Sequence, residues 1–164
     1  MTTHHALDHT KERSIYPHIL VPIDGSETSA CALAEAIKLA KSLNSRLRLL
    51  HVVNEHVLDV TSGGGTYADG LIEFLREQGK KIVRDAMALV RRQGVDAETV
   101  VLESIGGPAA DSIVEQAKQW PAQLIVMGTH GRRGLRRLAL GSDSESVVRD
   151  APAPVLLVRP GEIQ

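Results

Sequence analysis

The residues best suited to chemistry lie in positions 124–145, where glycines recur at a defined spacing. Gly128 and Gly131 are separated by two residues, and nine further residues lead to Gly141 and Ser142. A glycine lets the backbone turn tightly and lets a ligand approach N–H groups with no Cβ in the way. A helix that opens at Gly141 would present its first unpaired N–H groups, with about half a positive charge, to a phosphate. We therefore predict a nucleotide-phosphate cradle here.

Part of this stretch also has a plainer interpretation. Ser142 and Glu145 match a capping box, in which the serine hydroxyl accepts from a helical N–H and the glutamate reaches back. This alternative accounts for the serine and the glutamate, but it leaves the three glycines unexplained.

The elements that must position these residues alternate along the chain. Four apolar residues before Gly128 are typical of a strand buried on both faces of a parallel sheet. We expect the other strands at 17–24, 46–54, 97–103 and 155–158, and helices at 26–43, 71–93, 109–118 and 142–149. The buried stripe of the long helix at 71–93 is expected to consist of five apolar residues: Leu71, Leu75, Ile82, Ala86 and Leu89. Such alternation predicts a single-domain α/β fold with a mostly parallel sheet and helices on both faces. Residues 1–15 are interpreted as a flexible tail and residues 16–164 as the domain.

A glycine-rich segment at 61–65 lies between the strand expected at 46–54 and the helix expected at 71–93. Its formal match to a dinucleotide fingerprint, Gly63-x-Gly65-x-x-Ala68, does not follow the first strand directly and does not open a helix at once. We therefore interpret it as a surface loop.

Composition excludes several classes of function. The chain has 164 residues, 43% of them hydrophobic, which suits one domain with a substantial core. A net charge of −1 and 2% aromatic residues argue against nucleic acid or anionic membrane as a partner. The single cysteine, Cys31, fits a reducing compartment, and without a signal sequence or a membrane-length apolar run we expect a cytoplasmic protein.

No set of side chains at metal-ligand or catalytic-triad spacing is evident, so no catalytic or metal-binding residue is predicted. A basic loop follows Gly131, and we expect one or two of its arginines to contact phosphate: Arg132, Arg133, Arg136 and Arg137.

The spacing Gly-x2-Gly-x9-Gly-Ser resembles the nucleotide-binding signature of the universal stress protein family, in its ATP-binding subgroup, and the resemblance extends over residues 16–160. It implies a Rossmann-like sheet of the adenine nucleotide alpha-hydrolase type, with strand order 3-2-1-4-5. The chain would then reverse between strands one and four, which would bring Asp24 opposite Gly128 at a crevice that commonly binds ligands.

The resemblance also implies an adenine-nucleotide (ATP, ADP or AMP) site. It assigns the base and ribose end to Pro22, Ile23 and Asp24, and the adenine edge to Val52. The floor of the site and its loop would be Met127, Gly128, His130, Gly131 and Arg132. The phosphate end would be Gly141, Ser142, Asp143 and Ser144. Asp24 has an alternative role, because an acid after a strand often holds the following turn. Asp143 would repel phosphate unless Mg²⁺ lies between them or its side chain faces solvent.

The last expected strand has consequences for assembly and function. Val155, Leu156, Leu157 and Val158 would form an apolar edge, and the resemblance implies a homodimer through this strand. We expect a regulatory, stress-response role in which nucleotide occupancy biases the dimer or an unidentified protein partner. The alternative is slow ATP hydrolysis or transfer, although the Gly-x4-Gly-Lys-Ser/Thr loop of many such enzymes is absent.

Overall fold

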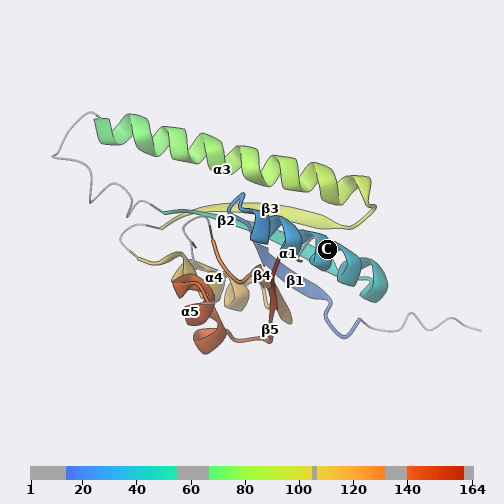
Figure 1. Cartoon of the computed structure of the whole chain (residues 1–164). Coiled ribbons are helices and arrows are strands. Elements are labelled where there is room, and N and C mark those ends of the chain that lie inside the picture. Colours follow the sequence, from blue (N-terminus) through green and yellow to red (C-terminus); the bar gives the residue numbers. More distant parts are fainter. Residues whose placement is uncertain (1–13, 55–66, 105–106, 132–139, 161–164) are drawn as a thin grey trace, which may run out of the picture.

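The computed structural model describes residues 14–54, 67–104, 107–131 and 140–160 (Figure 1). Strands and helices alternate in the order β1 (His18–Pro22), α1 (Glu27–Leu43), β2 (Arg46–Asn54), α3 (Tyr67–Arg92), β3 (Ala97–Ser104), α4 (Ala109–Gln119), β4 (Leu124–Gly128), α5 (Ser142–Asp150) and β5 (Val155–Val158). The five strands form one parallel sheet in the order β3-β2-β1-β4-β5, which confirms the predicted fold. The expected tail, the glycine-rich segment 61–65 and the basic loop lie outside the described residues.

The sheet divides at its centre. β1 pairs with β4 only at Ile19–Leu124 and Leu20–Ile125, whereas its pairing with β2 continues to Pro22–Leu50. Beyond these pairs the carboxyl ends of β1 and β4 separate. In open α/β sheets this is the place where ligands bind.

Helices cover both faces of the sheet, with α1 and α3 on one side and α4 and α5 on the other (Figure 1). The core between the sheet and helices α1 and α3 contains every second side chain of the strands, such as Val21 and Leu49, together with apolar residues of these two helices. The second core takes the alternate side chains, such as Leu20 and Leu50, and packs them against α4 and Val147 of α5. This period-two alternation is what a sheet covered on both faces requires.

Helix α3 differs from the expectation in two respects. It begins at Tyr67, four residues before the predicted start at 71, and its most buried side chains are Val83, Met87 and Val90 rather than the predicted stripe. The predicted stripe is only partly buried: Leu71, Leu75, Ile82, Ala86 and Leu89. The cause is Gly79, because a Cβ built there would lie 2.6 Å from Cδ2 of His51 on β2. The helix packs tightly on β2 at this glycine, so the residues in helical register with Gly79 face the core.

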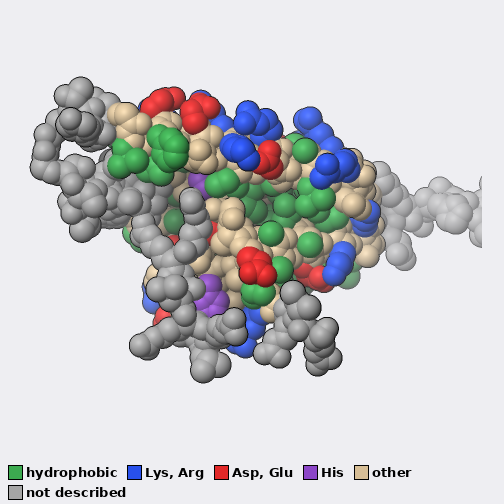
Figure 2. Space-filling view, turned by 45° about the horizontal axis from the view of Figure 1, so that its top comes forward, with side chains coloured by type: hydrophobic (Ala, Val, Ile, Leu, Met, Phe, Trp, Pro, Cys, Tyr) green, Lys and Arg blue, Asp and Glu red, His purple; other side chains and the backbone are tan. Residues whose placement is uncertain are grey.

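The outer surface of α3 carries charged side chains of both signs (Figure 2). Ion pairs three or four residues apart join Lys80 to Glu77 at 2.7 Å and Lys81 to Asp85 at 2.7 Å. Such exposed pairs stabilise a helix only slightly. No helix among the described residues is long and apolar enough to span a bilayer.

Candidate functional site

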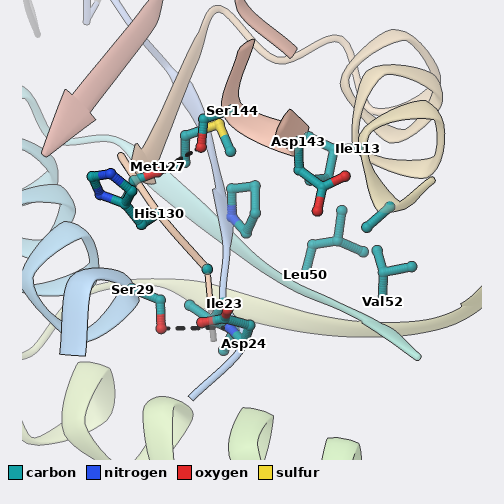
Figure 3. A pocket seen from close by; sticks show the side chains of 14 residues that line it. Ile23, Asp24, Ser29, Leu50, Val52, Ile113, Met127, His130, Asp143 and Ser144 are labelled. Atoms are coloured by element: carbon teal, nitrogen blue, oxygen red, sulfur yellow. Dashed lines mark hydrogen bonds between the residues drawn. The ribbon is translucent and has the colours of Figure 1, made fainter. Parts of the chain in front are cut away.

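A pocket opens where β1 and β4 separate (Figure 3). Its empty space is about 530 Å³, part of which is continuous with solvent. The pocket is lined by residues of β1, β4 and β2, of the loops that follow β1 and β4, and of the N-terminal parts of α1, α4 and α5: Pro22, Ile23, Asp24, Ser29, Leu50, Val52, Ala109, Ile113, Met127, Gly128, His130, Gly131, Asp143 and Ser144.

One part of the pocket is apolar. Leu50 and Val52 are two residues apart on β2, so their side chains leave the same face of the sheet. Ala109 and Ile113 are four residues apart on α4 and therefore share one face of that helix. Figure 3 shows Leu50, Val52 and Ile113 gathered on one side of the pocket. These side chains form a surface suited to a flat, apolar ring.

The Asp24 carboxylate organises the turn that follows β1. Its Oδ1 accepts hydrogen bonds from the backbone N–H of Ser26 at 2.9 Å and from the Ser26 hydroxyl at 2.6 Å. The turn-holding role considered from the sequence is therefore present, and Asp24 lines the pocket as well. The other oxygen, Oδ2, lies 2.9 Å from the position that a Cβ on Gly131 would occupy. The glycine thus lets the loop after β4 approach the carboxylate.

The backbone before Asp24 is fixed from both sides. The Ile23 N–H donates to the Leu50 carbonyl at 2.8 Å, and the Ile23 carbonyl lies 2.7 Å from Nδ1 of the buried His51. Because a carbonyl only accepts, Nδ1 of His51 carries the hydrogen. The pocket wall at Ile23 is therefore held by β2 alone, since β4 has already turned away.

The three signature glycines also serve close packing between parts of the chain, a role that the sequence did not indicate. A Cβ at Gly128 would lie 2.9 Å from the carbonyl carbon of Thr28, in the first turn of α1. A Cβ at Gly141 would lie 3.3 Å from the Thr129 carbonyl oxygen. Gly128, Gly131 and Gly141 do not adopt a positive φ, so a left-handed backbone is not what requires glycine at these positions.

Helix α5 begins without a side-chain cap among the described residues. Its N-cap is Gly141, and Ser142 is the first helical residue, so the capping-box interpretation of Ser142 and Glu145 is wrong. The Gly141 N–H donates to the Thr129 carbonyl at 2.9 Å, which fixes the start of the helix against the loop after β4. The first-turn N–H groups receive no described cap, and they carry the positive end of the helix dipole.

Ser144 and His130 are held by other parts of the chain. The Ser144 hydroxyl is buried and donates to the Gly128 carbonyl at 3.0 Å, which attaches α5 to β4. Nδ1 of His130 lies 2.9 Å from the Thr129 hydroxyl, and the His130 carbonyl accepts from the Thr28 hydroxyl. Nε2 of His130 is buried without a hydrogen-bond partner among the described residues.

Most of the predicted site residues meet in this pocket: Pro22, Ile23, Asp24, Val52, Met127, Gly128, His130, Gly131, Asp143 and Ser144. Gly141 and Ser142 adjoin its lining through the start of α5 without lining it, and Arg132 lies outside the described residues.

Sequence reasoning missed four lining residues: Ser29, Leu50, Ala109 and Ile113. Leu50 could have been found, because strand alternation places it on the same face as Val52. For Ala109 and Ile113 the sequence carries no such signal, because only the packing of α4 against the sheet brings them to the pocket.

The charged side chains in the described lining of the pocket are few. The two acidic side chains that line it are Asp24 and Asp143, and the described residues contain no group of three or more side chains able to hold a metal ion. On the surface, a hydrogen bond from Arg76 lowers the pKa of Glu103 below its ordinary value, and one from Lys80 lowers the pKa of Glu77. Both acids are exposed, so these are surface ion pairs rather than catalytic groups.

Comparison with known proteins agrees with the geometry. Residues 15–159 match the model of the universal stress protein family. The chain is 37% identical, over 150 residues, to universal stress protein MJ0531 of Methanocaldococcus jannaschii, covering 89% of this chain and 84% of the relative.

Two solved structures extend the comparison. The hypothetical protein MJ0577 superposes with a TM-score of 0.78 at 27% identity, covering 90% of this chain and 98% of that one. A universal stress protein from Archaeoglobus fulgidus, solved in complex with dAMP, superposes with a TM-score of 0.62 at 25% identity, covering 88% and 98%. The chain therefore belongs to the universal stress protein family.

Proposed function

We propose that this protein binds an adenine nucleotide, with ATP as the principal candidate, and acts as a regulatory stress protein rather than as a metabolic enzyme. The observation that carries the proposal is one pocket with an apolar wall on one side and an uncapped helix start on the other. The complex of the Archaeoglobus fulgidus relative with dAMP supports the same class of ligand.

The two sides of the pocket suggest how the nucleotide lies. The adenine would pack between Leu50 and Ile113, with backbone groups of Val52 at its edge. The ribose would lie near Asp24, whose carboxylate can accept a hydrogen bond from a hydroxyl group. The phosphates would then reach the first N–H groups of α5 and the loop at Gly131, with Arg132 as a further contact. Asp143 would be the carboxylate that holds Mg²⁺ if the ion accompanies the nucleotide, and the ion would offset negative charge on the phosphates.

The test is a release experiment on freshly purified protein. Gly131→Val should abolish co-purification of adenine nucleotide, as measured by mass spectrometry, because its Cβ would lie 2.9 Å from Oδ2 of Asp24. The matched control is Gly70→Val on α3, where a Cβ meets nothing within 4 Å. If nucleotide co-purifies equally with wild type and with Gly131→Val, the ligand lies elsewhere. If none is retained and none binds on addition, the proposal fails.

The proposed regulation requires assembly through β5. This strand is an edge of the sheet, Leu156 is 37% exposed, and Val148 of the neighbouring α5 is 48% exposed. An apolar edge strand tends to pair with another chain, and Pro154 limits how far such pairing could extend. We propose a homodimer through Val155–Val158. Sedimentation should give a dimer for wild type and a monomer for Leu156→Lys, and a monomeric wild type at high concentration would contradict the proposal.

Slow hydrolysis of ATP is the competing activity. It would require a group that activates water or stabilises the transferred phosphoryl group, and the described pocket lining contains no lysine. A turnover above about one per second, in the ordinary range of enzymes, would favour the enzymatic alternative. We expect a regulatory protein that binds nucleotide in the reducing environment of the cytoplasm and hydrolyses it far more slowly than this.

A further inference from the structure

The charged side chains in the described walls of the pocket are both acidic. Asp24 and Asp143 line it, and no lysine or arginine does so among the described residues. The starts of α4 and α5 also reach the pocket, through Ala109 and through Asp143 itself, and each helix start carries about half a positive charge. The two helix starts therefore offset about one of the two negative charges.

The two carboxylates differ in what holds them. Asp24 is bonded to Ser26 and shapes the turn after β1. Asp143 is exposed and lies in the first turn of α5, and Figure 3 shows its carboxylate pointing toward the side of the pocket that Leu50 and Ile113 line. An acid in a first turn stabilises its own helix through the dipole, but it also repels any anion in front of that turn.

We infer that Asp143 is a specificity-determining residue, which makes the pocket favour adenine ligands of low negative charge, a nucleoside or monophosphate, over the triphosphate when no divalent cation is present. The inference rests on the proposed function, because it concerns the ligand of the same pocket. Two unit charges 4 Å apart in water repel each other enough to lower affinity about fivefold, and each added phosphate brings further charge to this turn.

The experiment measures the affinities of adenosine, AMP, ADP and ATP by calorimetry, in EDTA and at low salt. The variant is Asp143→Asn, which removes the charge and keeps the shape. The matched control is Glu145→Gln, which removes the same charge from the same helical turn at a residue that does not line the pocket.

Asp143→Asn should raise affinity least for adenosine and most for ATP, by up to about fivefold for a ligand charge about 4 Å from the carboxylate and by less for charges farther away. The gain should shrink as salt is added, because the residue is exposed and its charge is screened. Glu145→Gln should leave the ratio of ATP to adenosine affinity close to that of wild type.

Four results would overturn the inference, and they can be told apart. If both variants change the series equally, net charge rather than position 143 is responsible. If Asp143→Asn weakens binding of every ligand, adenosine included, the carboxylate is an acceptor for base or ribose. If the series binds with unchanged preference, Asp143 does not sense ligand charge, although the proposed function stands. If no member binds to wild type or to either variant, the proposed function fails together with the inference.

Discussion

Helices α1 and α5 both begin beside the pocket, but their first turns are completed in different ways. At α1 the Ser26 hydroxyl accepts from the Ser29 N–H at 3.2 Å, and Asp24 holds Ser26 in place. At α5 the N-cap is Gly141, and no described side chain takes the first N–H groups. The first turn of α1 is therefore capped by a side chain of this chain, whereas the first amides of α5 have no described side-chain cap.

Both first turns rest on the same strand residue. Thr28 of α1 packs against the α-carbon of Gly128, and Ser144 of α5 donates to the Gly128 carbonyl. The two helices therefore share a support while differing in their caps. Variants can separate these contributions, because each of the contacts belongs to a different side chain.

The largest effect is expected for Gly128→Ala. The added Cβ would lie 2.9 Å from the carbonyl carbon of Thr28, a backbone atom that cannot move without shifting α1. Overpacking of this kind costs about 1–3 kcal/mol, so the free energy of unfolding in urea should fall by that amount. Gly70→Ala is the control, because it meets nothing within 4 Å and places a better helix former in α3. Equal stability of both variants would mean that α1 does not rest on Gly128.

A smaller loss is expected for Ser144→Ala. The variant leaves the Gly128 carbonyl without the buried hydroxyl that donates to it at 3.0 Å. An unsatisfied buried group costs about 1–3 kcal/mol, and we expect the lower half of that range because α5 can shift slightly. Hydrogen exchange should show faster opening of α5 and unchanged protection of α1. Faster exchange in both helices would mean that the two starts do not open independently.

The smallest effects test the caps directly. Ser26→Ala removes an N-cap and should lower the free energy of unfolding by about 1 kcal/mol. Ser142→Ala replaces an exposed first helical residue and should change it by less than about 0.5 kcal/mol. Thermal unfolding of the two variants measures the difference. A loss at Ser142 as large as that at Ser26 would restore the capping-box interpretation and remove the contrast between the helices.

The elements of the fold could be predicted because their signals are local. The apolar run before Gly128 indicates β4, the alternation along β2 indicates that strand, and Ser26 marks the start of α1. The strand order came from the family resemblance and not from periodicity, since pairing between distant strands leaves no local mark. For α3, the predicted stripe was offset from the centre of the buried face, although Ile82, Ala86 and Leu89 do pack against the core. Gly79, which marks the contacting face, has no side chain to enter a hydrophobic pattern.

The site was predictable in its members but less so in their roles. A glycine in a sequence indicates a missing Cβ without indicating what uses the space, and at Gly128 nothing in the sequence indicates that Thr28 does so. Ser142 matched a capping pattern, but a helix that starts one residue earlier changes the role of its hydroxyl. Ile113 was missed because helix packing alone brings it to the pocket.

The contact between Gly79 and His51 restricts how this chain can vary. The imidazole holds the Ile23 carbonyl at the pocket wall while its other edge lies directly under α3, where a Cβ at position 79 would be 2.6 Å away. A side chain at 79 is therefore compatible only with a smaller residue at 51, and a smaller residue at 51 releases the wall at Ile23. Positions 51 and 79 should accordingly covary among relatives, although 28 residues of chain separate them and neither belongs to the signature.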